Sequence, residues 1–209
     1  MSAWRGAQSM LKQLRSYAYA LISDRRGIAA VEFAFVVPLL LSLYFVTMEV
    51  SQAIETNKKV SRAGSMVADL ITQQQTIKAT EVDAVMKIAE SILQPYNRST
   101  GKIFITAIQV TDEASPQVLV VWSRKYVDGV GKPDVVKDTV TTVPDALKTK
   151  GAFLIRVVSE LDYKPMITWA AESKPVLGLA AAIDPITMDE TYYLRPRMSQ
   201  TIPCTGCEI

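Results

Sequence analysis

Residues 25–50 read RRGIAAVEFAFVVPLLLSLYFVTMEV, and this stretch decides the fold. Between Ile28 and Met48 the only charged side chain is that of Glu32. A helix needs about 20 apolar residues to cross the hydrocarbon core of a bilayer. The stretch therefore predicts one membrane-spanning helix over residues 28–48.

The charges that flank this span predict its orientation. Arg25 and Arg26 immediately precede it, and Glu49 is the first charged residue after it. Because positively charged residues are retained on the cytoplasmic side, we expect a cytoplasmic N-terminus and an extracytoplasmic C-terminal domain. A cleaved secretory signal peptide is an alternative, although its apolar region usually has about 7–15 residues. A plain membrane anchor is a second alternative.

Two details of the stretch are not needed by a plain anchor. Gly27 separates the arginine pair from the apolar run, and Glu32 lies inside that run. An ionisable group within a span is costly and commonly has a function. The alternative for Glu32 is a position near the interface, from which its carboxylate reaches water.

These residues resemble the cleavage region of type IV pilin-like proteins, and in particular the TadE-like minor pilins, or pseudopilins, of the tight-adherence (Flp) pilus system. The matching residues are Gly27, Ala30, Val31, Glu32, Phe33, Ala34, Pro38 and Glu49. The resemblance implies that prepilin peptidase cuts between Gly27 and Ile28 and removes residues 1–27 as a leader. It also implies that Glu32 and Phe33 act in subunit assembly, with the carboxylate pairing with the terminal ammonium of an adjacent subunit.

The same resemblance implies where the protein acts and with what. Its expected partners are prepilin peptidase, other pilin or pseudopilin subunits, the pilus assembly platform and inner-membrane lipid. We expect a periplasmic domain on an inner-membrane span, which can enter a surface pilus. Because major Flp pilins are very short chains, a chain of 209 residues resembles a minor component. The alternative is an uncleaved bitopic protein whose outer domain binds a ligand or senses a signal.

Composition argues against several other classes of protein. The chain has no His, which excludes imidazole catalysis and His-ligated metal. Beyond the leader, acidic side chains slightly outnumber basic ones, so we expect no nucleic-acid partner. No phosphate-binding loop, nucleophile motif or metal-ligand spacing occurs in the sequence. We therefore expect a structural role with no enzymatic activity and no cofactor.

The hydrophobic spacing beyond the span predicts an α+β domain. A three-to-four spacing continues the membrane helix as an amphipathic helix over residues 49–76, and residues 77–209 form the extracytoplasmic domain. Small residues on the helix, such as Gly64, allow close approach of a partner, for which we favour the domain's own sheet over a neighbouring subunit. A second helix is predicted from an N-cap at Thr80 to a point before Pro95. Alternating apolar residues then predict strands at 102–111, 117–127, 153–161 and 187–194, which form a mainly antiparallel, pilin-like sheet.

Several smaller features complete the prediction. Residues 112–116 are expected to form a hairpin connection, 128–133 a loop, and 166–183 an apolar loop or short helix. Tyr192, Tyr193, Arg195 and Arg197 are candidates for anion or glycan recognition, although we favour alternation within a last strand as the reason for the tyrosines. Cys204 and Cys207 have the spacing of a redox motif but lack a following helix. In an oxidising compartment we expect them to form a structural disulfide.

Overall fold

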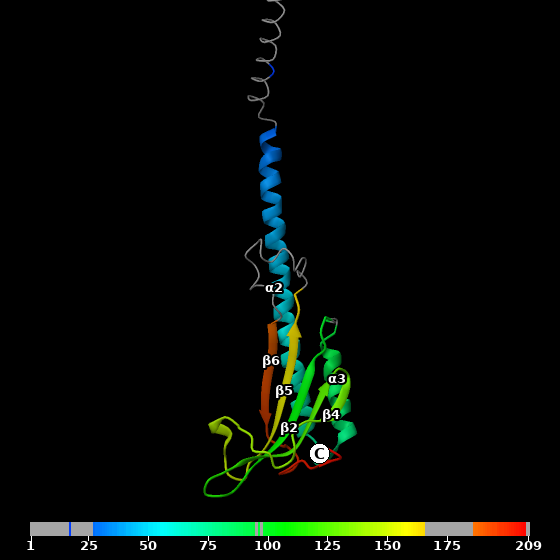
Figure 1. Ribbon diagram of the computed structural model, residues 1–209, viewed down its shortest axis with the longest axis vertical. Coiled ribbons are helices and arrows are strands. Elements are labelled where there is room, and N and C mark those ends of the chain that lie inside the picture. The colour runs from blue at the N-terminus through cyan, green and yellow to red at the C-terminus, as the bar shows by residue number, and fades with distance from the viewer. Residues whose placement is uncertain (1–16, 18–26, 95, 97, 166–185, 208–209) are drawn as a thin grey trace, which may run out of the picture. The chain divides into compact units, whose positions relative to one another are not determined.

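The computed structural model describes Tyr17 and residues 27–94, 96, 98–165 and 186–207. The chain divides into two units, Met1–Met48 and Glu49–Ile209. One helix, α2 (Ile28–Thr72), begins in the first unit and continues into the second (Figure 1). The apolar segment predicted at 166–183 and, apart from Tyr17, residues 1–26 of the predicted leader lie outside the described residues.

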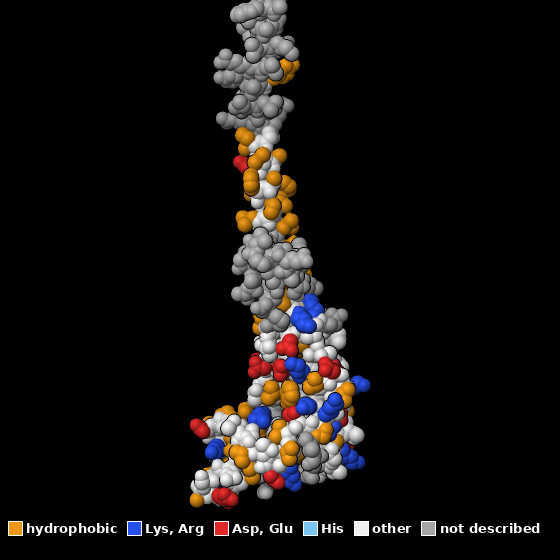
Figure 2. Space-filling view, viewed as in Figure 1, with side chains coloured by type: hydrophobic (Ala, Val, Ile, Leu, Met, Phe, Trp, Pro, Cys, Tyr) orange, Lys and Arg blue, Asp and Glu red, His pale blue; other side chains and the backbone are white. Residues whose placement is uncertain are grey.

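In the first unit, α2 is long and apolar enough to cross a membrane, with a mean hydropathy of 2.2 in its most apolar window and no burial there. Figure 2 shows hydrophobic side chains covering the visible part of this helix. Pro38 lies inside the helix and removes one backbone donor. The hydroxyls of Ser42 and Thr47 donate to carbonyl oxygens of the preceding turn, each at 2.8 Å, so they are satisfied without water.

The second unit combines the rest of α2 with a second helix and a five-stranded antiparallel sheet. The elements are α3 (Ala79–Ile92), β2 (Lys102–Val110), β3 (Val118–Val127), β4 (Val130–Pro133), β5 (Phe153–Tyr163) and β6 (Ile186–Leu194). The strand order is β4-β3-β2-β5-β6, and each neighbouring pair is antiparallel. This arrangement confirms the predicted α+β class. A short helical turn, η2 (Asp145–Leu147), lies between β4 and β5.

The core lies between the two helices and one face of the sheet, which we call the inner face. Alternate strand residues point to this face because side chains in a strand alternate between its two sides. The buried core residues include Val67 and Ile71 of α2, Val82 and Met86 of α3, and Ile105, Trp122, Ile155 and Val157 of the sheet. The C-terminal tail joins this core: Ile202 is fully buried, and its carbonyl accepts a 2.7 Å hydrogen bond from Trp122 Nε1.

The small residues of α2 allow the helix to lie directly on the sheet. A Cβ at Gly64 would lie 2.6 Å from Ser159 Oγ and 3.1 Å from the ring of Tyr192. Ser159 Oγ donates to the Val60 carbonyl at 3.0 Å, and the hydroxyls of Ser61 and Tyr192 are 2.6 Å apart. The expectation that the domain's own sheet covers this face of the helix is therefore confirmed.

The four predicted strands and the β2–β3 hairpin are confirmed, but the predicted loop at 128–133 is wrong. Residues Val130–Pro133 form β4, which pairs with β3. The two turn residues, Asp128 and Gly129, have φ angles of 52° and 77°. Positive φ at both positions is the geometry of a type I′ hairpin turn, for which Asp-Gly is a preferred sequence.

The predicted start of the second helix is also wrong, by two residues. The N-cap is Lys78 rather than Thr80, and the Lys78 N–H donates to the Glu81 carboxylate at 2.8 Å. The reason is a tertiary contact, because β1 (Ile77–Lys78) pairs in parallel with β7 (Cys204–Thr205). The chain therefore passes from a strand directly into the helix.

Asp83 lies in the second turn of α3 and binds the sheet. Its two carboxylate oxygens accept from Arg124 Nε at 2.8 Å and Nη2 at 2.6 Å. The Arg124 side chain is buried, so this bidentate pair fixes α3 on β3. A Cβ at Gly131 of β4 would overlap the Asp83 carboxylate, which explains why a glycine fits there.

Candidate functional site

The predicted processing and assembly residues lie together at the start of α2. The helix begins at Ile28, directly after Gly27. A Cβ at Gly27 would have no atom within 4 Å, so the fold of the described residues does not require a glycine at this position. Glu32 lies one helical turn after Ile28, on the same side of the helix. Glu32 and Phe33 are both exposed, and no described residue forms an ion pair with Glu32.

A second group of polar and aromatic residues surrounds the first residue of the second unit. We call Glu49, Gln52, Tyr96, Arg98 and Tyr163 the juxtamembrane cluster. Tyr163 Oη donates to Glu49 Oε1 at 2.5 Å, and Arg98 Nη1 lies 4.0 Å from the same oxygen. Arg98 Nη2 donates to Gln52 Oε1 at 3.1 Å. Tyr96 stacks on Tyr163 with ring centroids 5.4 Å apart, and Arg98 lies 5.3 Å from the centre of the Tyr96 ring.

The cluster holds Glu49 of α2 on the sheet. Tyr163 is the last residue of β5 and is only 1% exposed. Burial, followed by the hydrogen bond to Glu49, raises the pKa of Tyr163 to about 12. Glu49 is one peptide bond beyond Met48, so this contact fixes α2 to the sheet at the first residue of the second unit. Glu49 can be singled out from the sequence, but Tyr163 and Arg98 cannot, because no local pattern links three residues so far apart in the chain.

We expect Tyr163→Phe to lower the free energy of unfolding of the second unit by about 1–2 kcal/mol, because a carboxylate loses a charge-assisted hydrogen bond. The folded state favours the neutral phenol, so this contribution is complete below about pH 10 and is lost as the pH rises toward 12. Urea unfolding of the full chain in detergent, measured at pH 8 and at pH 11, tests both statements. Tyr193→Phe is the matched control, because no described residue bonds the Tyr193 hydroxyl.

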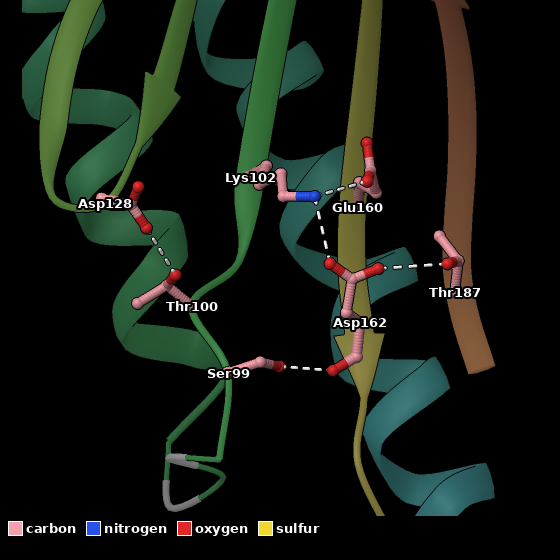
Figure 3. Close-up of polar contacts among 7 residues, drawn as sticks. All are labelled: Ser99, Thr100, Lys102, Asp128, Glu160, Asp162 and Thr187. Atoms are coloured by element: carbon pink, nitrogen blue, oxygen red, sulfur yellow. Dashed lines mark hydrogen bonds and ion pairs between the residues drawn. The ribbon is translucent and has the colours of Figure 1, made fainter. Parts of the chain in front are cut away.

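The opposite side of the sheet, the outer face, carries a separate polar network (Figure 3). Lys102 Nζ donates to Glu160 Oε1 at 2.8 Å and to Asp162 Oδ2 at 3.1 Å, and Thr187 donates to the other Asp162 oxygen at 3.1 Å. The hydrogen bonds to Glu160 and Asp162 raise the pKa of Lys102. The bond from Lys102 is the main cause that lowers the pKa of Asp162. Ser99 Oγ also donates to the Asp162 carbonyl at 2.6 Å. The network joins β2, β5 and β6 across the outer face.

Four of the C-terminal residues singled out from the sequence, Tyr192, Arg197, Cys204 and Cys207, have structural contacts. A disulfide joins Cys204 and Cys207, whose Cα atoms are 5.6 Å apart, and Cys207 is buried in the core. Tyr192 points to α2, as described above. Arg197 forms an ion pair with Asp69 of α2 at 2.5 Å, and its backbone N–H donates to the last residue of that helix. These contacts fix the tail on the domain.

Residues 27–69 match the family model TadE, which is described as TadE-like protein. The chain carries a TadE-like segment. The match begins at Gly27, directly before the first residue of α2, and ends three residues before that helix does. It is consistent with a TadE-like protein of the tight-adherence pilus system. Searches of curated proteins and of solved structures gave no match.

Proposed function

We propose that this protein is a minor pilin or pseudopilin of a tight-adherence pilus. Its TadE-like helix holds the precursor in the inner membrane, with the outer domain in the periplasm. Prepilin peptidase cuts between Gly27 and Ile28, and the mature chain then joins other subunits in a filament or at the assembly platform. The role is structural, without an enzymatic reaction.

One observation carries this proposal: the TadE-like match starts at the glycine that directly precedes an exposed, apolar helix with one carboxylate near its beginning. A carboxylate in apolar surroundings is costly unless it has a partner of opposite charge. No described residue of this chain supplies that partner for Glu32. The terminal ammonium that cleavage creates on another subunit is a charge of the required sign.

The juxtamembrane cluster supports the same function. A subunit whose helix packs in an assembly transmits force between that helix and its outer domain. The Tyr163–Glu49 and Arg98–Gln52 hydrogen bonds fix the helix to the sheet where the span ends. Further along, the close packing around Gly64 continues this attachment. A sensor that changes its helix-to-domain angle would instead favour a loosely attached helix.

Removal of the protein from cells that make the pilus tests this function. We expect sheared surface fractions to lose assembled pilin, and we expect the wild-type gene to restore it. The measurement is the amount of major pilin in sheared and membrane fractions. Unchanged pilin in the sheared fraction, with normal surface attachment, would contradict the proposal and favour the bitopic sensor.

A further inference from the structure

Described residues cover one half of the outer face of the sheet and leave the other half open. In the covered half, an apolar group of Ile108, Val110, Val118 and Leu154 packs against Val143, Leu147 and Ala152 of the β4–β5 connection. In the open half, Phe104, Val127 and Val158 are half-buried, and Val130 is 50% exposed. A hollow of about 380 Å³ lies over this half, lined by Phe104, Lys125, Val127, Asp128, Val130 and Lys132. Figure 2 shows hydrophobic side chains between acidic and basic ones on this side.

Charge in the open half differs between the two edges of the sheet. The strands near one edge, β3 and β4, carry Lys125 and Lys132, and the strands near the other edge, β5 and β6, carry Glu160, Asp162 and Asp189. Most of these groups are paired within the chain, as Lys125 is with Asp134 at 3.0 Å. Lys132 on β4 and Asp189 on β6 are both exposed, and no described residue pairs with either. These two strands form opposite edges of the sheet.

We propose that a second copy of this chain docks on the open half of the outer face, around a two-fold axis parallel to the strands. Such an axis places β4 of each copy opposite β6 of the other and β2 opposite itself. Lys132 of each copy then pairs with Asp189 of the other copy. Phe104 on β2 lies near the axis and packs against its own counterpart, as apolar residues do between two facing sheets.

The direction of α2 selects this axis. Within the second unit, Glu49 of α2 contacts Tyr163 at one end of the sheet, and Thr72 accepts from Arg197 near the other end. The helix therefore runs along the strands. An axis parallel to the strands keeps the Glu49 ends of both copies on the same side, so both spans can enter one membrane. An axis perpendicular to the strands would point the spans in opposite directions.

Self-complementarity favours a second copy over other occupants. The face carries at one edge a cation and at the other an anion that no described residue pairs, with apolar side chains between them. A two-fold contact makes the Lys132–Asp189 ion pair twice, so the same surface on the two copies supplies a partner for each of these charges. The proposal does not depend on removal of the leader, because the docking residues all lie in the extracytoplasmic domain.

Cysteine cross-linking of the full chain in membranes tests the geometry. With a short bismaleimide, Phe104→Cys should give a dimer of the chain, because the two thiols face each other at the axis. Ile88→Cys is the matched control, since Ile88 is 54% exposed but lies on α3, on the other side of the sheet. Equal cross-linking of the two variants, or a product that contains a different protein, would overturn the proposal.

Charge reversal then tests the contact itself. In the Phe104→Cys background, Lys132→Glu alone and Asp189→Lys alone should each lower the dimer yield about tenfold, because each places like charges together twice. Co-expression of the two single variants with different tags should restore cross-linking between them, because both contacts then join opposite charges. The chain that carries both reversals should also form dimers, which shows that the substitutions preserve the fold. Single variants that cross-link like the parent would contradict the contact.

Discussion

Gly27→Val should leave a full-length, membrane-bound precursor with no detectable mature chain. Glycine leaves the peptide bond after residue 27 free of side-chain bulk, whereas a β-branched residue crowds the bond that a peptidase must reach. The substitution should not disturb the fold of the described residues, since a Cβ at this position meets no atom within 4 Å. Loss of processing would therefore reflect recognition by the peptidase rather than misfolding. The measurement is the ratio of precursor to mature chain in membranes.

Ala29→Val is the matched control for this variant. It adds the same branched side chain two residues further along, on an exposed position of α2 rather than on the residue that precedes the scissile bond. We expect this control to be processed in normal amounts. Normal processing of Gly27→Val would contradict cleavage after residue 27, whatever the control shows.

Glu32→Gln should be inserted and processed normally but should fail to assemble. The substitution keeps the volume of the side chain and removes its charge. Insertion becomes easier by up to about 2–3 kcal/mol if the carboxylate lies deep in the bilayer. The terminal ammonium of the adjacent subunit then lacks its partner in apolar surroundings, which is strongly destabilising. The processed protein should therefore be abundant in membranes and absent from sheared filaments or cross-linked complexes.

Glu55→Gln is the control for the same chemical change outside the span. Glu55 is exposed on α2, and among the described residues its ion pair is with Lys59, four residues on, at 3.1 Å, so its loss should have little effect. If Glu32→Gln assembles as well as this control, Glu32 is an interface residue whose carboxylate reaches water. The assembly role would then be contradicted while cleavage remained possible.

The span, the long helix and the main strands could be predicted because each rests on local periodicity. A run such as 28–48 needs no knowledge of the rest of the fold, and the alternation in β2, β3, β5 and β6 is equally local. The hairpin at Asp128-Gly129 has a local signal only in its Asp-Gly pair, because the segment that follows, Val130–Pro133, is not an alternating apolar stretch. The strand there is fixed by its pairing with β3.

The remaining features depend on contacts between distant parts of the chain. The start of α3 is set by pairing of Ile77–Lys78 with a strand near residue 204, so the local N-cap pattern at Thr80 is overridden. The juxtamembrane cluster requires Tyr163 to reach Glu49 across 114 positions. By contrast, Gly27 and Glu32 could be identified as candidates because peptidase and assembly residues lie together in one short segment.

The mass of the intact protein, purified from membranes of cells with and without prepilin peptidase, tests the central claim most directly. We expect a chain that begins at Ile28 in cells with the peptidase and a chain that retains residues 1–27 in cells without it. A chain that retains its leader in both kinds of cell would contradict the account and leave an uncleaved bitopic protein.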